Sequence, residues 1–146
     1  MDRTQFETVR DLPGKRIDQD IRFARRAALA PVVVAEDIRI GNGAGLDLVL
    51  TIHFNSVTLV KTFNVHVRGS GPICRLDVDG PAHRPVGRSH KHALQGERCP
   101  ERNLPDGVVD RSDLSGRRLR EVFGVFCELA RITHVGTAEW PDEGGA

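Results

Sequence analysis

Hydrophobic and polar positions alternate along residues 47–54 and again along residues 57–67. A period of two places alternate side chains on opposite faces of a strand, so both segments predict strands with one buried face and one solvated face. The dipeptide at 55–56 separates them and predicts a two-residue hairpin turn with Phe54 opposite Val57. The residues expected on the buried face are Leu48, Leu50, Ile52, Phe54, Val57, Leu59, Phe63, Val65 and Val67.

Lys61 breaks this pattern, because the predicted register places it on the apolar face opposite Leu50. Either a lysine stem that reaches solvent at the sheet edge or a β-bulge that shifts the register would accommodate it. His53 and His66 fall on the polar face. We therefore predict that both are exposed strand residues.

Three more segments predict strands: residues 32–35, with a continuation toward residue 40, and residues 73–78 and 88–94. In the 73–78 segment Arg75 and Asp77 share one face, so Asp77 is placed either to pair with Arg75 or to orient a histidine. The turns between the strands are rich in Gly, Pro, Asn and Asp, which favour tight connections.

Two segments show the three-to-four residue spacing of an amphipathic helix. The longer, residues 113–132, carries an apolar stripe, and the shorter, residues 17–29, has Ile17 and Ile21 on one side. Residues 1–14 are expected to be loosely structured and residues 95–111 to form a long loop. Residues 136–146 are expected to be a disordered tail, with Trp140 docked on the domain. The stripe of the longer helix consists of Leu119, Val122, Phe123, Phe126, Leu129 and Ile132.

The order of these elements predicts an α+β fold. We expect an antiparallel β-meander with one face covered by a C-terminal amphipathic helix and a short N-terminal helix. The length of 146 residues favours a single domain over residues 1–146, with an ordered core at about residues 15–135.

Composition places the chain among soluble globular proteins. It is 39% hydrophobic and 28% charged, its formal net charge is +1, and its three cysteines are widely spaced. It has no apolar run long enough to cross a membrane and no hydrophobic leader at its N-terminus. We therefore expect a cytoplasmic protein with reduced thiols and no membrane partner.

The charge is unevenly distributed. Residues 68–102 hold seven Arg or Lys against four Asp or Glu, a local charge of +3. Residues 75–92, inside this stretch, also contain three of the six histidines. This concentration of ionisable side chains makes residues 75–92 the candidate site.

Three interpretations of residues 75–92 remain open. His83, His90 and His92 with Cys99 have the side chains of a zinc site, although nearby arginines disfavour a cation. Alternatively, the histidines act as general acid and base on a phosphodiester while cations hold its oxygens. The third interpretation is a solvated basic loop at a sheet edge, or a basic surface, spanning residues 68–102, that binds a protein or another anionic partner without catalysis.

A short signature in this stretch resembles that of a family of small uncharacterised bacterial proteins. In that family an Arg-Leu-Asp strand leads to Gly-x-x-His and then to a His-x-His strand. Here Arg75-Leu76-Asp77, Gly80-Pro81-Ala82-His83 and His90-Lys91-His92 match it. The resemblance covers residues 47–132 and implies a toxin–antitoxin or mobile-element context, and with it an RNA-acting toxin.

The combined reading is a ribonuclease-like toxin that needs no metal or other cofactor, with RNA and a cognate antitoxin or other protein as partners. The predicted roles divide among eight residues. His83, His90 and His92 are the catalytic candidates, and Asp77 is the orienting residue. The predicted substrate-binding residues are Arg75, Arg84, Arg88 and Lys91.

Overall fold

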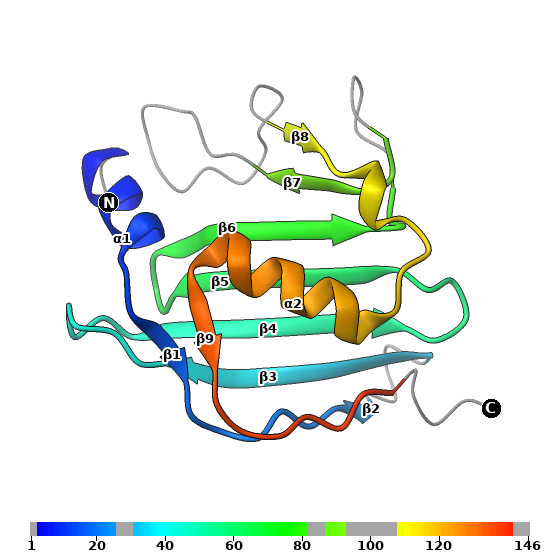
Figure 1. Cartoon of the computed structure of the whole chain (residues 1–146), viewed down its shortest axis with the longest axis horizontal. Helices are drawn as coiled ribbons and strands as arrows, with labels where there is room; N and C mark the ends of the chain where they lie inside the picture. The colour runs from blue at the N-terminus through cyan, green and yellow to red at the C-terminus, as the bar shows by residue number, and fades with distance from the viewer. Residues whose placement is uncertain (1–2, 26–30, 82–86, 93–107, 142–146) are drawn as a thin grey trace.

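The alternating segments form a seven-stranded antiparallel sheet in the computed structural model, which describes residues 3–25, 31–81, 87–92 and 108–141. Neighbouring strands along the sheet are also neighbours in sequence, as expected for a meander (Figure 1). From one edge to the other the strands are β2 (Ala24–Arg25), β3 (Val32–Ile40), β4 (Leu48–Asn55), β5 (Lys61–Val67), β6 (Gly71–Val78), β7 (His90–His92) and β8 (Val108–Asp110).

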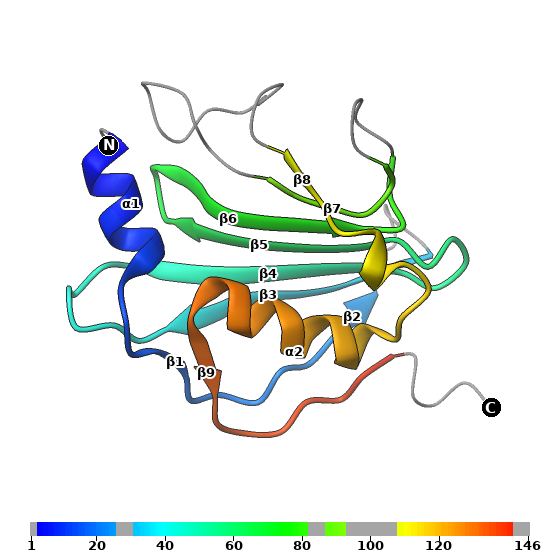
Figure 2. The same cartoon turned by 45° about the horizontal axis from the view of Figure 1, so that its top comes forward.

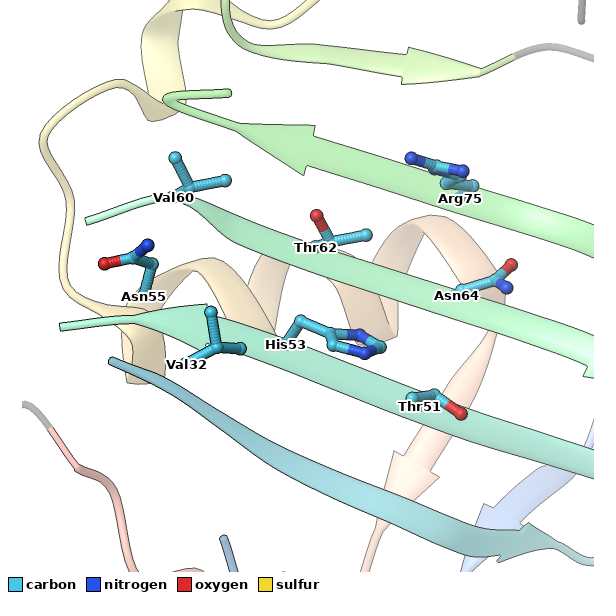
Figure 3. A pocket seen from close by; sticks show the side chains of 8 residues that line it. All are labelled: Val32, Thr51, His53, Asn55, Val60, Thr62, Asn64 and Arg75. Atoms are coloured by element: carbon cyan, nitrogen blue, oxygen red, sulfur yellow. The ribbon is translucent and has the colours of Figure 1, made fainter. Parts of the chain in front are cut away.

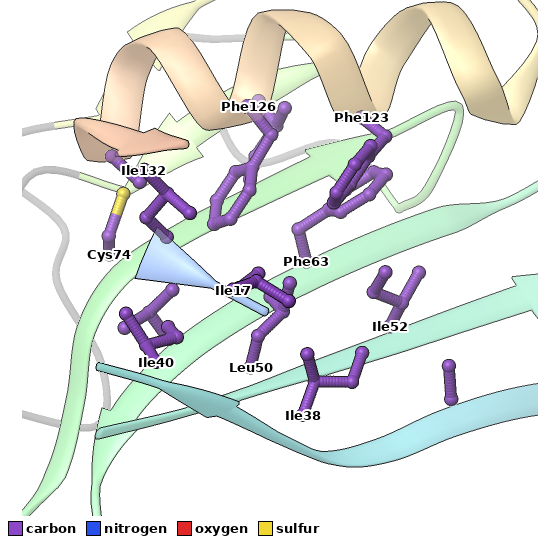
Figure 4. Packing of buried hydrophobic residues seen from close by; sticks show 14 of the residues in the cluster. Ile17, Ile38, Ile40, Leu50, Ile52, Phe63, Cys74, Phe123, Phe126 and Ile132 are labelled. Atoms are coloured by element: carbon purple, nitrogen blue, oxygen red, sulfur yellow. The ribbon is translucent and has the colours of Figure 1, made fainter. Parts of the chain in front are cut away.

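Helix α2 (Leu119–Ala130) lies across one face of this sheet (Figures 1 and 2). Its apolar stripe faces the strands, and the rings of Phe63 on β5 and Phe126 on α2 stack with centroids 5.1 Å apart (Figure 4). A short 3₁₀ helix, Ser112–Leu114, precedes it. At its end Arg131 adopts a left-handed conformation with φ of 54°, which terminates the helix.

Three smaller elements complete the core. Strands β1 (Lys15–Ile17) and β9 (Ile132–His134) form a parallel pair on the side of the sheet that α2 covers. Ile17 and Ile132 extend the apolar cluster there (Figure 4). Helix α1 (Arg3–Asp11) lies at one end of the sheet and buries Phe6 and Val9.

The sheet face opposite α2 is called the open face here. It carries the alternate residues of the central strands, which are mostly polar. Antiparallel sheets commonly pack one face on a core and leave the other accessible, and the alternation of the sequence imposes that division here. Among the described residues, no helix is long and apolar enough to cross a membrane.

The predicted α+β class and the helix-covered meander are confirmed. The long helix is shorter than the predicted 113–132 because its first residues form the 3₁₀ turn. The predicted strand at residues 88–94 is present as β7, and β3 extends to Ile40 across a bulge between Ala35 and Ile38.

The predicted hairpin register is wrong. Phe54 pairs with Lys61 instead of Val57, because five residues, 56–60, connect the two strands, and the Asn55 N–H closes this turn by donating to the Val60 carbonyl. Lys61 nevertheless lies on the apolar face, as predicted, and is buried. Its ammonium group donates to the Asp79 carboxylate over 3.2 Å and lies 6.0 Å from the ring centroid of Phe54.

The position of the short N-terminal helix is also wrong. It spans Arg3–Asp11, whereas the described part of the predicted 17–29 helix contains no helix, and the rest, residues 26–29, lies outside the described residues. Ile17 and Ile21 are buried because they pair with the C-terminal segment, which overrides their helical spacing.

Two segments predicted to be irregular contain paired residues. Within the predicted loop 95–111, residues 108–110 form β8 beside β7. In the predicted tail, Ala138 bridges to Ile21. Trp140 packs against Phe23 and Phe123, so its predicted docking is confirmed.

Candidate functional site

Strands β6 and β7 pair, and this pairing determines which candidate residues share a face. Arg75 lies opposite His92 and Asp77 lies opposite His90. Directly opposite positions of an antiparallel pair belong to the same face. By backbone register His90 and His92 therefore occupy open-face positions, whereas Lys91, opposite Leu76, occupies a position of the other face.

Register relates these positions to the rest of the open face. One row across the strands runs His53, Thr62, Asp77 and His90. Within a row, neighbouring strands are about 4.8 Å apart, and adjacent rows are separated by about 7 Å along the strand. The next row runs Thr51, Asn64, Arg75 and His92.

A cavity of about 680 Å³ lies on this face (Figure 3). Its residues form three levels along the strands: a hairpin end, a middle level with His53 and Thr62, and a far end that includes Arg75. The volume lies within the usual range of a small-molecule site. The complete lining is Val32, Thr51, His53, Asn55, Val60, Thr62, Asn64 and Arg75.

Arg75 and Asp77 form an ion pair, which is one of the two roles that the sequence allows for Asp77. Nε of Arg75 lies 3.2 Å from Oδ2 of Asp77. The Asp77 side chain is only 7% exposed, whereas that of Arg75 is 45% exposed. The buried carboxylate thus holds one edge of the guanidinium while the remaining donors are accessible from the cavity.

His53 is the main cavity residue that sequence reasoning missed. It was predicted to be an exposed strand residue, but it is half-buried and lines the same cavity as Arg75. The alternation of 47–54 assigns it correctly to the polar face. Its proximity to the candidate stretch depends on strand order and register, which the pattern of one strand does not contain.

Two polar atoms on the open face are buried without a hydrogen-bond partner among the described residues. They are Oδ1 of Asn64 and Nδ1 of His66. A buried polar atom without a hydrogen bond costs free energy. Asn64 lines the cavity. Because its Oδ1 has no hydrogen-bond partner among the described residues, no such bond holds the Asn64 amide in one orientation.

Comparison of the chain with protein-family models, curated proteins and solved structures found no match.

Arg88, a predicted substrate-binding residue, contacts the backbone of the connection between β6 and β7. Its Nη2 donates to the Asp79 carbonyl over 2.8 Å and its Nε donates to the Gly80 carbonyl over 3.2 Å. These hydrogen bonds connect the last part of the β6–β7 connection, at Arg88, to its first residues. Of the other candidates, His83 and Arg84 lie outside the described residues, as does Cys99.

Asp79 joins this loop to the rest of the fold. Its Oδ2 accepts hydrogen bonds from the Lys61 ammonium group and from the Gly116 N–H, at 3.2 and 3.1 Å. Its own N–H donates to the Ser89 hydroxyl oxygen. Asp79 adopts a left-handed φ of 58°, which aspartate tolerates. The Asp-Gly-Pro sequence is therefore a structural turn that positions the end of β6.

The basic character of residues 68–102 is partly neutralised where the structure describes it. Arg68 pairs with Asp37 at 3.0 Å and with Asp47 at 3.2 Å. In these pairs and in the Arg75–Asp77 pair, nearby carboxylates neutralise the positive charges of the two arginines. Arg75 is the described arginine of this stretch that lines the open-face cavity.

The described residues contain no group of three or more His, Cys, Asp or Glu side chains placed to hold a metal ion. Two of the predicted zinc ligands, His83 and Cys99, are outside those residues. Of the described cysteines, Cys74 is buried, and burial raises the pKa of the Cys127 thiol to about 12. Cys127 is therefore an unreactive thiol at neutral pH.

Proposed function

We propose that this protein binds RNA on the open face of its sheet and cleaves the RNA backbone. The observation that supports the proposal is the cavity itself, which brings His53 and Arg75 from different strands into one concave space. The register adds the positions of His90 and His92 at the edge of the same face. Arg75, Asp77, His90 and His92 of the 75–92 stretch remain part of the proposed site, and β4 and β5 extend it.

Arg75 is suited to hold the phosphate. A guanidinium group matches the geometry of phosphate oxygens and keeps its charge at all physiological pH values. The ion pair with Asp77 orients the group at the far end of the cavity. Arg75 would also stabilise the negative charge that develops on the non-bridging oxygens during the reaction.

His53 and His90 are the proposed acid and base. The proton affinity of histidine is suited to proton transfer near neutral pH. The two residues belong to one row, three strands apart, which separates their Cα atoms by roughly 14 Å. A phosphate placed above Thr62 and Asp77 would lie between them, as an in-line displacement requires.

The proposed step needs no further reactant. One histidine takes the proton of the ribose 2′-hydroxyl as that oxygen bonds to phosphorus. The bond from phosphorus to the 5′-oxygen breaks, and the other histidine donates a proton to this leaving oxygen. The products are a 2′,3′-cyclic phosphate and a 5′-hydroxyl, and both histidines have exchanged their protonation states.

In the toxin context that the sequence signature implies, the cognate antitoxin would be a protein that covers the open face. The alternative of a non-catalytic basic module would instead rely on the exposed cations of residues 68–102. The ion pairs of Arg68 reduce the free positive charge available to it. If this alternative holds, a charge reversal such as Arg88→Glu should weaken the binding of an anionic partner, and the binding should also weaken as the salt concentration rises.

The test of the proposal is cleavage of a fluorescent single-stranded RNA by purified protein. His53→Gln and His90→Gln remove the titrating group but keep a polar side chain, and each should lower the cleavage rate at least about a hundredfold. His134→Gln is the matched control, because His134 lies on the α2 side and bonds to the Gln19 carbonyl. Equal rates for all three variants would refute a catalytic role for the open face.

A further inference from the structure

The hairpin end of the cavity contains a hydrogen-bond donor whose direction is fixed. Asn55 is the last residue of β4, and its Oδ1 accepts the N–H groups of Val57 and Thr58 at 2.9 and 3.0 Å. These two bonds identify the oxygen of the amide and turn it toward the hairpin. The nitrogen is therefore on the opposite side, next to Val60 (Figure 3).

Two valine side chains flank this donor. Val32 lies opposite Asn55 in the β3–β4 pair, and Val60 accepts the Asn55 N–H through its carbonyl at 2.9 Å. Both valines are half-buried and line the cavity. The Nδ2 group of Asn55 has no acceptor among the described residues, so it remains available to a ligand.

An amide donor between two apolar side chains suits the edge of a planar ring. The ring faces contact the valines, and an acceptor on the ring edge receives the N–H. Because Oδ1 already accepts two hydrogen bonds from the turn, the amide offers only its donor to the cavity. The complementary group on a ligand is a carbonyl oxygen, and an exocyclic amino group in that place would leave two donors facing each other.

The other end of the cavity gives the ligand its orientation. Thr51, which lies in the same row as Arg75, is four residues from Asn55 along β4, about 14 Å at the rise of a strand. This length exceeds that of a ribose and accommodates a base, a sugar and a phosphate laid out along the strands. An amphipathic anion with a ring at one end and a phosphate at the other matches both ends.

We infer that the hairpin end is a nucleobase subsite that selects bases carrying a carbonyl oxygen, with Asn55 as the specificity-determining residue. The inference rests on the proposed function in one respect: both place the phosphate of the bound nucleotide at Arg75. It goes further because it assigns the apolar end of the cavity and the direction in which a nucleotide lies along the strands.

The test compares two nucleotides that differ only in the relevant group. Inosine 5′-monophosphate carries a carbonyl oxygen where adenosine 5′-monophosphate carries an amino group. Isothermal titration of the full chain should give inosine 5′-monophosphate at least tenfold tighter binding. Loss of one such hydrogen bond, with an unpaired donor left behind, corresponds to about a factor of ten or more.

Asn55→Asp provides the matched variant. One carboxylate oxygen still accepts the N–H groups of Val57 and Thr58, so the turn is retained, while the second oxygen replaces the donor by an acceptor. The preference should therefore vanish or reverse in favour of adenosine 5′-monophosphate. Thr58→Asp adds the same charge to the same turn but lies outside the cavity lining, and it should leave the ratio of the two affinities unchanged.

Each outcome is decisive. Equal binding of the two nucleotides by the wild type, an unchanged preference in Asn55→Asp, or no binding of either nucleotide at millimolar concentration would overturn the inference. The RNA cleavage assay judges the proposed function separately. Cleavage that depends on His53 but shows no base preference leaves that function standing, whereas a base preference without cleavage leaves only the subsite.

Discussion

Lys61 shows how one residue that contradicts the hydrophobic pattern is accommodated. The Lys61 side chain is 3% exposed and that of Asp79 is 18% exposed, and the two form an ion pair. The carbonyl of Leu59 accepts a second hydrogen bond from the ammonium group at 2.8 Å. A charge buried in this way depends on its partners, because removing one partner leaves the desolvation penalty of the other uncompensated.

Asp79→Asn should therefore lower the free energy of unfolding by about 3 kcal/mol. Asparagine still accepts the Gly116 N–H and tolerates the left-handed backbone, so only the charge is lost. Urea denaturation measures the effect. Asp37→Asn is the matched control, since it breaks an exposed pair with Arg68 and should cost less than about 1 kcal/mol. Equal costs for the two variants would contradict a structural role for the buried pair.

Among the secondary-structure elements, the β4–β5 hairpin contains a strained backbone that the sequence pattern did not reveal. Leu59 adopts a φ of 64° and is 50% exposed. Its backbone N–H donates to the Asn55 carbonyl at 2.8 Å. The alternation of 57–67 assigned Leu59 to the buried face, but Leu59 lies in the five-residue turn 56–60 and not in the strand.

Leu59→Gly should stabilise the protein slightly, by about 0.5 kcal/mol, despite the loss of a leucine. A left-handed backbone costs a residue with a side chain about 1–2 kcal/mol, and glycine returns roughly half of that gain as entropy in the unfolded chain. Thermal unfolding measures the change. Val57→Gly, in the same turn at a residue without a positive φ, should destabilise instead. A melting temperature that falls for both variants would show that Leu59 is not strained.

The C-terminal segment is a second element, and one titratable side chain, that of Asp20, contributes to its attachment. Asp20 accepts the Thr137 N–H at 3.0 Å, and this bond holds the pKa of the carboxyl below its ordinary value of 3.8. A lowered pKa in the folded state means that the carboxylate favours docking above pH 3.8. This contribution disappears as the pH falls through the folded pKa.

Acidification should therefore loosen the segment near Trp140 below about pH 4. Trp140 is the one tryptophan of the chain, so its fluorescence reports the docking on Phe23 and Phe123 directly. The emission should shift to the red in this range, before far-ultraviolet circular dichroism reports loss of the sheet. Asp20→Asn keeps an acceptor without the titration, and an identical pH profile in that variant would exclude Asp20 as the cause.

For the whole molecule, the sequence predicted which segments form strands and helices better than it predicted which segments pair with one another. Alternation identified β4, β5 and β6, and helical spacing identified α2, because these patterns are local. The pattern could not predict that Ile17 and Ile21 would pair with the C-terminal segment, since this depends on contacts more than a hundred residues away. Helix α1 was missed because only Phe6 and Val9 mark its buried side.

The candidate site was predicted in part for the same reason. The ionisable residues of 75–92 are visible as a cluster in sequence, and Asp77 pairs with Arg75, one of the two roles expected for it. His53 and Asn55 are distant in sequence from this cluster. They join Arg75 in one cavity only through the order and register of β4, β5 and β6.

The central proposal is that the open face, rather than the helix-covered face or the ends of the sheet, receives RNA. Nuclear magnetic resonance titration of the labelled full chain with a short single-stranded RNA that carries a non-cleavable 2′-deoxy linkage tests it most directly. We expect the largest shift changes at Thr51, His53, Thr62, Asn64 and Arg75, and little change along α2. Changes confined to α2 or to the Arg68 region, or none at saturating RNA, would contradict the proposal.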